Sequence, residues 1–402
     1  MGNKNTLCVL PWNSVMIGVV FGKTILSVCC NSYEGSIKTD DGQHASTADL
    51  AQINELRFVK DLRQDLFDGV KNNYCNRCWN MEPDSFRSVS NIAFPTTISK
   101  LVASPHVNAC SQGIEYLTLN IGNKCNMACR MCNPLNSSLL EKEWILDQVP
   151  SSLNIHDIKT VTSSESMLLS DPDLLNFIKL HAATLRSIYI FGGEPLIIQK
   201  SHCDFLQLLI DLGVSKNISL KYSTNGSTTN IDKFVPLWEQ FKIIFMQVSV
   251  DGFRETYEYI RWPLDWNKID ANLKIFKELH DKRIINASIG TTVQALTITS
   301  VDNLLNYLDQ TYNFECHLIP VDQPEVMSLS IVPKDVLRQT LDEWKYGPLK
   351  AVVESIINPY LEKDDTAPLE KFNEFVAAMH WQDKFRKQDL FTTHPYMKQW
   401  HI

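Results

Sequence analysis

The sequence has no apolar run long enough to cross a membrane and no excess of basic charge. A membrane-spanning helix needs roughly 18 or more consecutive apolar residues, and the 402-residue chain contains no such run. The 46 aspartates and glutamates outnumber the 38 lysines and arginines, which gives a formal net charge of −8. We therefore expect no membrane partner, and the acidic balance disfavours a nucleic-acid partner.

Features of an export signal are also missing near the N-terminus. The apolar stretch over residues 9–20 is interrupted by Pro11, Asn13 and Ser14, and no small-residue cleavage site follows it. A secretory signal would show both an unbroken apolar core and such a site. We therefore expect a cytoplasmic protein whose cysteines are reduced thiols.

Cysteine, by contrast, is abundant. Eleven cysteines occur, and reduced thiols at regular spacing favour metal ligation over disulfides. The histidines show no ligand spacing. Seven of the cysteines fall into two groups, one of Cys125, Cys129 and Cys132, and one of Cys8, Cys29, Cys75 and Cys78.

Strand-like and helix-like patterns alternate from residue 115 onward. Such alternation predicts a parallel sheet with right-handed crossovers in an α/β fold. Six units are too few to close an eight-stranded barrel, so we expect an open, partial (β/α)6 TIM-like barrel. The predicted strands are 116–121, 187–191, 218–222, 245–250, 287–293 and 316–321.

Three parts are expected along the chain. Residues 1–90 form a small cysteine-rich module with a hairpin and a helix over 49–70. Residues 110–335 form the partial barrel, and residues 336–402 form a C-terminal helical segment.

The first cysteine group has the spacing C-x3-C-x2-C and directly follows the first strand of the α/β region. Three thiolates from one loop can hold three irons of a [4Fe–4S] cube, which leaves the fourth iron open to another ligand. The alternatives from these residues alone are a zinc site and three buried free thiols. Structural zinc normally takes four ligands, however, and this loop offers three with no histidine nearby.

Small and polar residues follow the next three strands. The segments are 192–195 (Gly-Gly-Glu-Pro), 223–226 (Ser-Thr-Asn-Gly) and 249–252 (Ser-Val-Asp-Gly). The carboxyl ends of barrel strands are where such folds place their sites. We therefore expect these segments and the cysteine loop to share one edge of the sheet.

Taken in this order, the motifs resemble the radical S-adenosylmethionine (radical SAM) superfamily over residues 115–335. The resemblance implies that Cys125, Cys129 and Cys132 hold a [4Fe–4S] cluster whose open iron binds the amino and carboxylate groups of SAM. Met131 stands where many members have an aromatic residue. The SAM-binding residues implied are Gly192, Gly193, Glu194 and Pro195 at the amino group, Ser223 and Asn225 near the ribose, Ser249 and Asp251 beside them, Arg261 at the carboxylate, and Val293 and Gln294 at the adenine.

The second cysteine group resembles the twitch or SPASM modules attached to radical SAM enzymes. Those modules usually follow the barrel, whereas here the match precedes it. The resemblance implies an auxiliary iron–sulfur cluster held by Cys8, Cys29, Cys75 and Cys78, with Cys30 an equal alternative to Cys29. A four-cysteine zinc site is the other interpretation.

The resemblance also implies a reaction. A flavodoxin or ferredoxin-type reductant supplies one electron, SAM is cleaved to methionine and a 5′-deoxyadenosyl radical, and that radical abstracts hydrogen from the substrate. We expect a peptide or protein substrate. The alternatives are a small-molecule or nucleotide substrate, and a non-catalytic scaffold that binds zinc.

Overall fold

A computed structural model describes residues 6–20, 22–29, 35–81, 98–99, 101, 103, 113–153, 168–363 and 368–400. Cys30 and Cys110 lie outside these residues. None of the helices described has the length and apolar character that a membrane span requires. The chain divides into two compact units. Unit 1 comprises 1–122, 164–222 and 232–244, and unit 2 comprises 123–163, 223–231 and 245–402.

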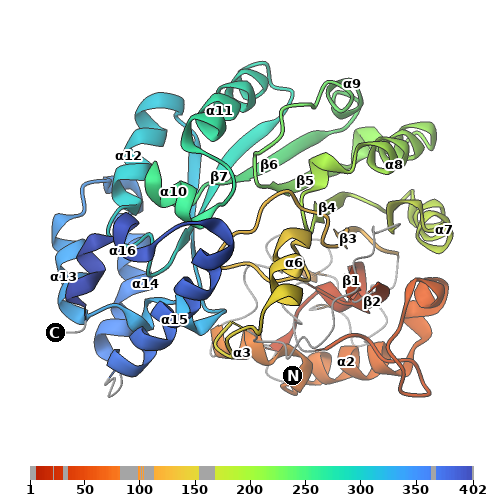
Figure 1. The fold of residues 1–402 in the computed structure, drawn as a ribbon. Helices are drawn as coiled ribbons and strands as arrows, with labels where there is room; N and C mark the ends of the chain where they lie inside the picture. The colour runs from red at the N-terminus through yellow and green to blue at the C-terminus, as the bar shows by residue number, and fades with distance from the viewer. Residues whose placement is uncertain are drawn as a thin grey trace. The chain divides into compact units, whose positions relative to one another are not determined.

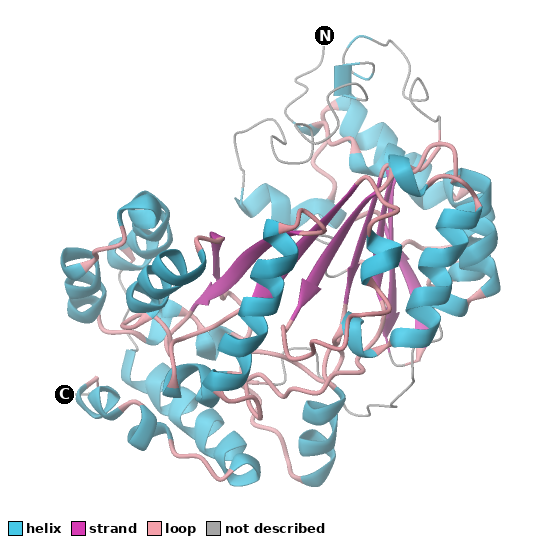
Figure 2. Cartoon of the chain, turned by 90° about the horizontal axis from the view of Figure 1, so that it is seen from above, coloured by secondary structure: helices cyan, strands magenta, loops and turns pink. Residues whose placement is uncertain are grey.

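The strands form one open sheet in the order β2-β1-β3-β4-β5-β6-β7-β8 (Figure 2). All pairings given by register are parallel except that of β1 with β2. The six predicted strands are confirmed as β3 to β8, so the open, partial barrel is the observed fold class. Their bounds are β3 Tyr116–Asn120, β4 Ser187–Phe191, β5 Ser219–Thr224, β6 Ile243–Ser249, β7 Asn286–Val293 and β8 Glu315–Pro320.

The predicted hairpin is present in unit 1 as β1 (Ser14–Val20) and β2 (Lys23–Ser27). It extends the main sheet, because β1 pairs in parallel with β3. The sequence did not predict this pairing, which joins two segments far apart in the chain.

The helix predicted over 49–70 is wrong as a single element. It is split into the 3-10 helix η2 (Thr47–Glu55) and the helix α2 (Arg57–Asp68), shown beside the hairpin in Figure 1. Leu56 interrupts the helix with ψ 131°, a non-helical value that accompanies burial of its side chain. Helix α2 ends at Gly69, whose left-handed φ of 85° suits glycine.

Helices α7, α8 and α9 of unit 1 lie between successive strands of the sheet, as the apolar spacing predicts, whereas α1 and α3 were not predicted. Helix α7 starts where Asp171 accepts hydrogen bonds from the backbone N–H groups of Asp173 and Leu174, a standard N-cap. The bounds in unit 1 are α1 Leu10–Asn13, α3 Asn76–Met81, α7 Pro172–His181, α8 Gln199–Asp211 and α9 Val235–Trp238.

Unit 2 contains the helix after the cysteine loop and the C-terminal helices, which are blue in Figure 1. Helix α11 buries Ile269, Leu273 and Phe276 on one face, as its spacing predicts. Helix α10 was not predicted. The bounds are α6 Ser138–Leu146, α10 Glu255–Ile260, α11 Trp266–Asp281, α12 Val301–Tyr312, α13 Lys334–Glu343, α14 Lys350–Glu362, α15 Pro368–Arg386 and α16 Leu390–Thr393.

Candidate active site

The cysteine loop of unit 2 is fixed by backbone hydrogen bonds on both of its sides. Ala128 N–H donates to the Trp262 carbonyl (2.8 Å), and Arg130 N–H donates to the Ile260 carbonyl (3.0 Å). Ser138, at the start of α6, accepts from Cys125 N–H (3.3 Å) and donates to the Cys125 carbonyl (3.1 Å). The loop is therefore a structured turn, and its shape does not depend on its sulfur atoms alone.

Two side chains are directed at the sulfur atoms of this loop. Asn225 Nδ2 lies 3.6 Å from Cys125 Sγ, and Arg261 Nη1 lies 3.7 Å from Cys129 Sγ. N–H donors of this kind stabilise thiolates and tune the metal groups they ligate. The structure thus brings Asn225 and Arg261 to the cysteines, whereas the resemblance had implied Asn225 near the ribose and Arg261 at the carboxylate of SAM.

Arg261 is held by Asp251, which is completely buried. Arg261 Nε donates to Asp251 Oδ2 (2.6 Å), and Nη2 forms an ion pair with the same oxygen. The other oxygen, Oδ1, accepts from both the backbone N–H (2.6 Å) and the hydroxyl (2.8 Å) of Thr292, in β7. Asp251 therefore orients the guanidinium that faces Cys129.

The charges at this site explain the direction of its pKa shifts. Burial alone would lower the pKa of Arg261, but Asp251, Cys129 and Tyr257 raise it above its ordinary value, so the guanidinium stays charged. Burial raises the pKa of Cys129, and burial with Cys129 beside it raises the pKa of Cys132 to about 12. The free thiols are therefore neutral at pH 7, and metal binding has to release their protons.

Two polar atoms near this ion pair have no hydrogen-bond partner among the described residues. They are the hydroxyl of Tyr257 and Oε1 of Gln294, both in completely buried side chains. Gln294 Nε2 donates to Thr292 Oγ1 (2.8 Å), which links it to Asp251. Buried polar atoms normally have partners, so these two are available to a bound ligand.

The predicted serines lie on strands of the sheet. Ser223 is in β5, two residues before Asn225, and Ser249 is the last residue of β6, two residues before Asp251. Both are half-buried. Asn225 also donates to Asn126 Oδ1 (3.1 Å), one residue after Cys125. Sequence reasoning missed Asn126, since a single asparagine inside the cysteine motif carries no signal of its own.

The donor set of this loop fits an iron–sulfur cube. It offers three thiols from one turn, of which Cys129 is buried and Cys125 and Cys132 are half-buried, and none is in a disulfide. Within the described ranges, no three His, Cys, Asp or Glu side chains form a group that would hold a single metal ion. A cube distributes its thiolates over three irons, so it does not require them to converge on one ion.

The Gly-Gly-Glu-Pro segment lies in unit 1, at the carboxyl end of β4. Gly192 has a φ of 132°, and a Cβ there would come within 2.8 Å of the Gly122 carbonyl oxygen, so only glycine fits. Gly193 N–H donates to that same carbonyl (2.7 Å). Glu194 is completely buried, and its Oε1 accepts from Leu196 N–H (3.0 Å).

His202 supports this segment from α8, and the sequence gave no sign of it. Its Nδ1 lies 3.2 Å from the Pro195 carbonyl oxygen, and its Nε2 lies 3.0 Å from the Tyr222 hydroxyl. The carbonyl can only accept, so Nδ1 carries the proton and Nε2 accepts from Tyr222. Burial lowers the pKa of His202 from 6.5 to about 4, so the ring is neutral.

We expect this histidine to make the protein acid-sensitive. Below about pH 6.5 His202 binds a proton in the unfolded chain but stays neutral in the folded protein. The free energy of unfolding therefore decreases as the pH falls from about 6.5 to about 4. The shift corresponds to about 3 kcal/mol, at about 1.4 kcal/mol per pKa unit. Urea unfolding at pH 4.5 and 7 should show His202→Asn losing less stability on acidification than the wild type. An identical loss in both proteins would contradict this role.

The second cysteine group lies in unit 1, and its four members are half-buried. Ser14 Oγ donates to the Val28 carbonyl (3.0 Å), and Val28 N–H donates to the Tyr74 hydroxyl (3.2 Å). These bonds bring the neighbours of Cys29 and Cys75 to the amino end of β1. Cys8 precedes α1, which leads into that same end.

Within unit 1, these cysteines and the Gly-Gly-Glu-Pro segment therefore lie at opposite edges of the parallel strands. The cysteines lie at the amino edge, and residues 192–195 follow the carboxyl end of β4. A five-residue strand such as β4 separates the two edges by about 17 Å.

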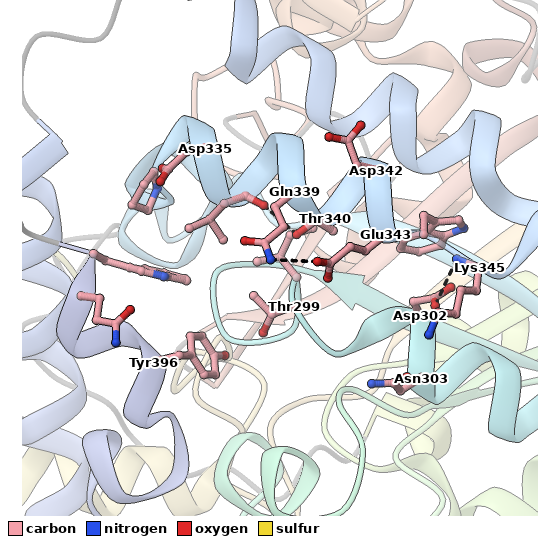
Figure 3. A pocket seen from close by; sticks show the side chains of 16 residues that line it. Thr299, Asp302, Asn303, Asp335, Gln339, Thr340, Asp342, Glu343, Lys345 and Tyr396 are labelled. Carbon is pink, nitrogen blue, oxygen red and sulfur yellow. Dashed lines mark hydrogen bonds between the residues drawn. The ribbon is translucent and has the colours of Figure 1, made fainter.

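A cavity of about 850 Å³ lies in unit 2 between α12, α13 and the C-terminal residues (Figure 3). Two of its acidic residues already have partners, since Asp302 accepts from Lys345 N–H (3.2 Å) and Glu343 accepts from Gln339 (2.9 Å). None of its described lining residues belongs to the predicted cluster or SAM-binding set. Its charged lining residues are Asp302, Asp335, Asp342, Glu343 and Lys345.

Comparison with known families finds a match within this chain. Residues 119–308 match the model of the radical SAM superfamily. The matched segment starts at the end of β3 and ends in α12, and it contains the three loop cysteines together with Asn225, Asp251 and Arg261. No curated protein is significantly similar in sequence.

Several solved structures are similar to this chain at low sequence identity. One is native anSMEcpe with bound AdoMet (18% identity, TM-score 0.37), where the match covers 57% of this chain and 58% of that chain. Streptococcus suis SuiB bound to S-adenosylmethionine has 12% identity and a TM-score of 0.37, with 86% and 70% covered. TYW1 with a lysine-pyruvate adduct has 10% identity and a TM-score of 0.29, with 60% and 71% covered. The chain spans less than two thirds of the length of anSMEcpe.

Proposed function

We propose that this protein is a radical SAM enzyme whose cluster is held by Cys125, Cys129 and Cys132. The observation that carries the proposal is the three-cysteine turn with Asn225 and Arg261 directed at its sulfur atoms. The radical SAM match over residues 119–308 supports it. When bound, the cluster with SAM supplies a 5′-deoxyadenosyl radical for hydrogen abstraction.

The residues around the turn have distinct roles in this proposal. Arg261 stabilises the Cys129 thiolate, and Asp251 keeps its guanidinium oriented. Gln294 and Tyr257 offer buried polar atoms to SAM, with Gln294 at the adenine. The burial of Cys129, Tyr257 and Gln294 excludes water, which protects a reactive carbon radical.

The proposal assigns further residues to SAM. Gly192, Gly193, Glu194 and Pro195 bind the amino group of SAM through closely approaching backbone, which the glycines permit. Ser223 and Asn225 bind near the ribose, with Ser249 on the next strand. The proposed reductant is a flavodoxin or ferredoxin, in the cytoplasm.

We propose a peptide or protein as the substrate. The support is the second cysteine group, whose order resembles modules that are attached to peptide-modifying radical SAM enzymes. A small-molecule or nucleotide substrate is the second candidate.

We propose that Cys8, Cys29, Cys75 and Cys78 hold an auxiliary iron–sulfur cluster that relays electrons or shapes the site. Four thiolates would leave no iron open to substrate. Their place at the amino edge of β1, opposite the Gly-Gly-Glu-Pro segment, also argues against a direct substrate contact beside SAM.

Anaerobic purification tests the enzyme proposal directly. After reconstitution with iron and sulfide, the full chain should contain iron and acid-labile sulfide. With dithionite and SAM it should form 5′-deoxyadenosine, measured by chromatography. A colourless protein that contains zinc and leaves SAM intact would instead favour the zinc-binding scaffold.

The auxiliary cluster has its own test. The double variant Cys75→Ala/Cys78→Ala should bind roughly half the iron of the wild type, since one of two clusters loses ligands, and it should keep some SAM cleavage. Cys203→Ala, which removes a half-buried cysteine outside both groups, should leave the iron content unchanged. Unchanged iron in the double variant would remove the auxiliary cluster from the proposal.

A further inference from the structure

Arg130 is part of the cysteine loop, directly after Cys129, and its side chain is completely buried. Its Nη2 donates to Asp383 Oδ1 (2.5 Å), and its Nη1 donates to Gln382 Oε1 (3.3 Å), both on α15. Its Nε donates to the Tyr259 carbonyl (2.7 Å), and the guanidinium lies 3.4 Å from the centre of the Tyr259 ring. A residue inside the cysteine motif is therefore bound to the C-terminal helix.

Helix α15 also holds the backbone of the loop. Gln382 Nε2 donates to the carbonyl oxygen of Arg130 (3.1 Å). This glutamine therefore hydrogen-bonds to both the side chain and the backbone of Arg130. Asp383 is itself fixed, because its Oδ2 accepts from Leu390 N–H (3.0 Å) and from the Tyr259 hydroxyl (3.3 Å). Asp383 is thus held in position by contacts that do not involve the Arg130 side chain.

A second buried ion pair joins α15 to the end of the loop. Arg386 donates to Glu143 through Nε (3.1 Å) and Nη2 (2.8 Å) in a two-pronged arrangement. Glu143 belongs to α6, the helix that follows the cysteine loop. The relative exposure of the two side chains is 0% and 8%, so the pair is shielded from water.

These contacts are stronger constraints than surface ion pairs. A buried charge that loses its partner is costly, so each pair strongly favours the one loop geometry that satisfies it. The planar guanidinium of arginine also donates its hydrogen bonds in fixed directions, whereas the ammonium group of lysine does not. Neither Arg130 nor Asp383 is a cluster ligand, and none of the contacts described requires the cluster.

We propose that Arg130, Asp383 and Gln382 are positioning residues through which α15 holds the cysteine loop in its ligand-binding shape before the cluster is assembled. This inference rests on the proposed function, since it assigns a partner element to the same cluster site. It extends the site from residues 119–308 to the C-terminal helical segment.

Two conservative variants test it in the full chain. Arg130→Lys keeps a positive charge beside Asp383 but loses the several hydrogen bonds that the guanidinium donates. Gln382→Leu removes the hydrogen bond to the loop backbone without leaving a buried charge unpaired. Lys384→Gln is the matched control, because Lys384 directly follows Asp383 in α15 and its side chain is exposed. Circular dichroism verifies folding of all three.

The readouts are the rate at which a chelator removes the cluster and the change in the EPR spectrum of the reduced protein when SAM is added. Loss of an outer-shell partner typically weakens metal binding by about 10–100-fold. We therefore expect cluster loss to be about 10-fold faster or more in both variants, with a smaller SAM-induced EPR change. Lys384→Gln should match the wild type in both measurements. The SAM-induced change reports the cluster with an open iron, so the auxiliary cluster does not obscure the result.

Folded variants that keep the cluster as firmly as the wild type would overturn the inference. So would failure of both variants to fold beside an intact Lys384→Gln protein, because the contacts would then serve the fold as a whole. If the wild type itself takes up no cluster, the proposed function fails, which is a different outcome from the other two.

Discussion

Replacing Cys129 by alanine should abolish 5′-deoxyadenosine formation while the fold survives. Cys129 is the most buried of the three loop cysteines and the one that faces Arg261. The [4Fe–4S] cluster needs three cysteine ligands from this loop, and the variant leaves only two. Removal of a residue that only contacts a metal ligand lowers activity by up to about 100-fold. We expect the rate of 5′-deoxyadenosine formation to fall by more than this, because Cys129 is itself a ligand. The measurement is product formation from SAM and dithionite after anaerobic reconstitution.

Cys316→Ala provides the control for this variant, since Cys316 is also buried but belongs to neither cysteine group. It should retain SAM cleavage at close to the wild-type rate. If the Cys129→Ala protein still formed 5′-deoxyadenosine, the assignment of the loop would be wrong.

Replacing Asp251 by alanine should destabilise the metal-free protein by about 3–5 kcal/mol, the usual cost of leaving a buried charge without its partner. Arg261 would lose its ion pair in a site where its side chain is only 10% exposed. The Cys129 thiol does not compensate, because burial raises its pKa and keeps it neutral. Two Thr292 donors would lose their acceptor as well. Urea unfolding at pH 7 gives the change directly.

Asp204→Ala is the matched control, because Asp204 forms an ion pair with Lys200 at the surface, where the two side chains are 64% and 92% exposed. A pair of this kind contributes about 0–1 kcal/mol, so the control should unfold close to the wild type. An Asp251→Ala protein as stable as this control would show that Arg261 does not depend on Asp251.

The elements that could be predicted from the sequence are those whose signal is local. Strands β3 to β8 lie where apolar residues alternate, and the polar segments lie at their carboxyl ends because parallel strands place them there. The split of the predicted helix at Leu56 was missed, since the apolar spacing continues through the break.

The residues that hold the site in place were not predictable in this way. His202 contacts Pro195 and Tyr222, and Arg130 reaches Asp383 across 253 positions of sequence. A buried histidine or arginine looks the same in a sequence whether it supports a site or only fills the core. Its partner appears only when the chain has folded.

The sequence by itself determined the strand order along the chain, the three-cysteine turn and the donors that follow the strands, because periodicity and spacing are carried by neighbouring residues. Tertiary structure decided that β1 lies beside β3, that Asp251 orients Arg261, and that α15 holds the cysteine loop. Those contacts depend on burial and on charges that find partners only in the folded state, where water no longer competes for them.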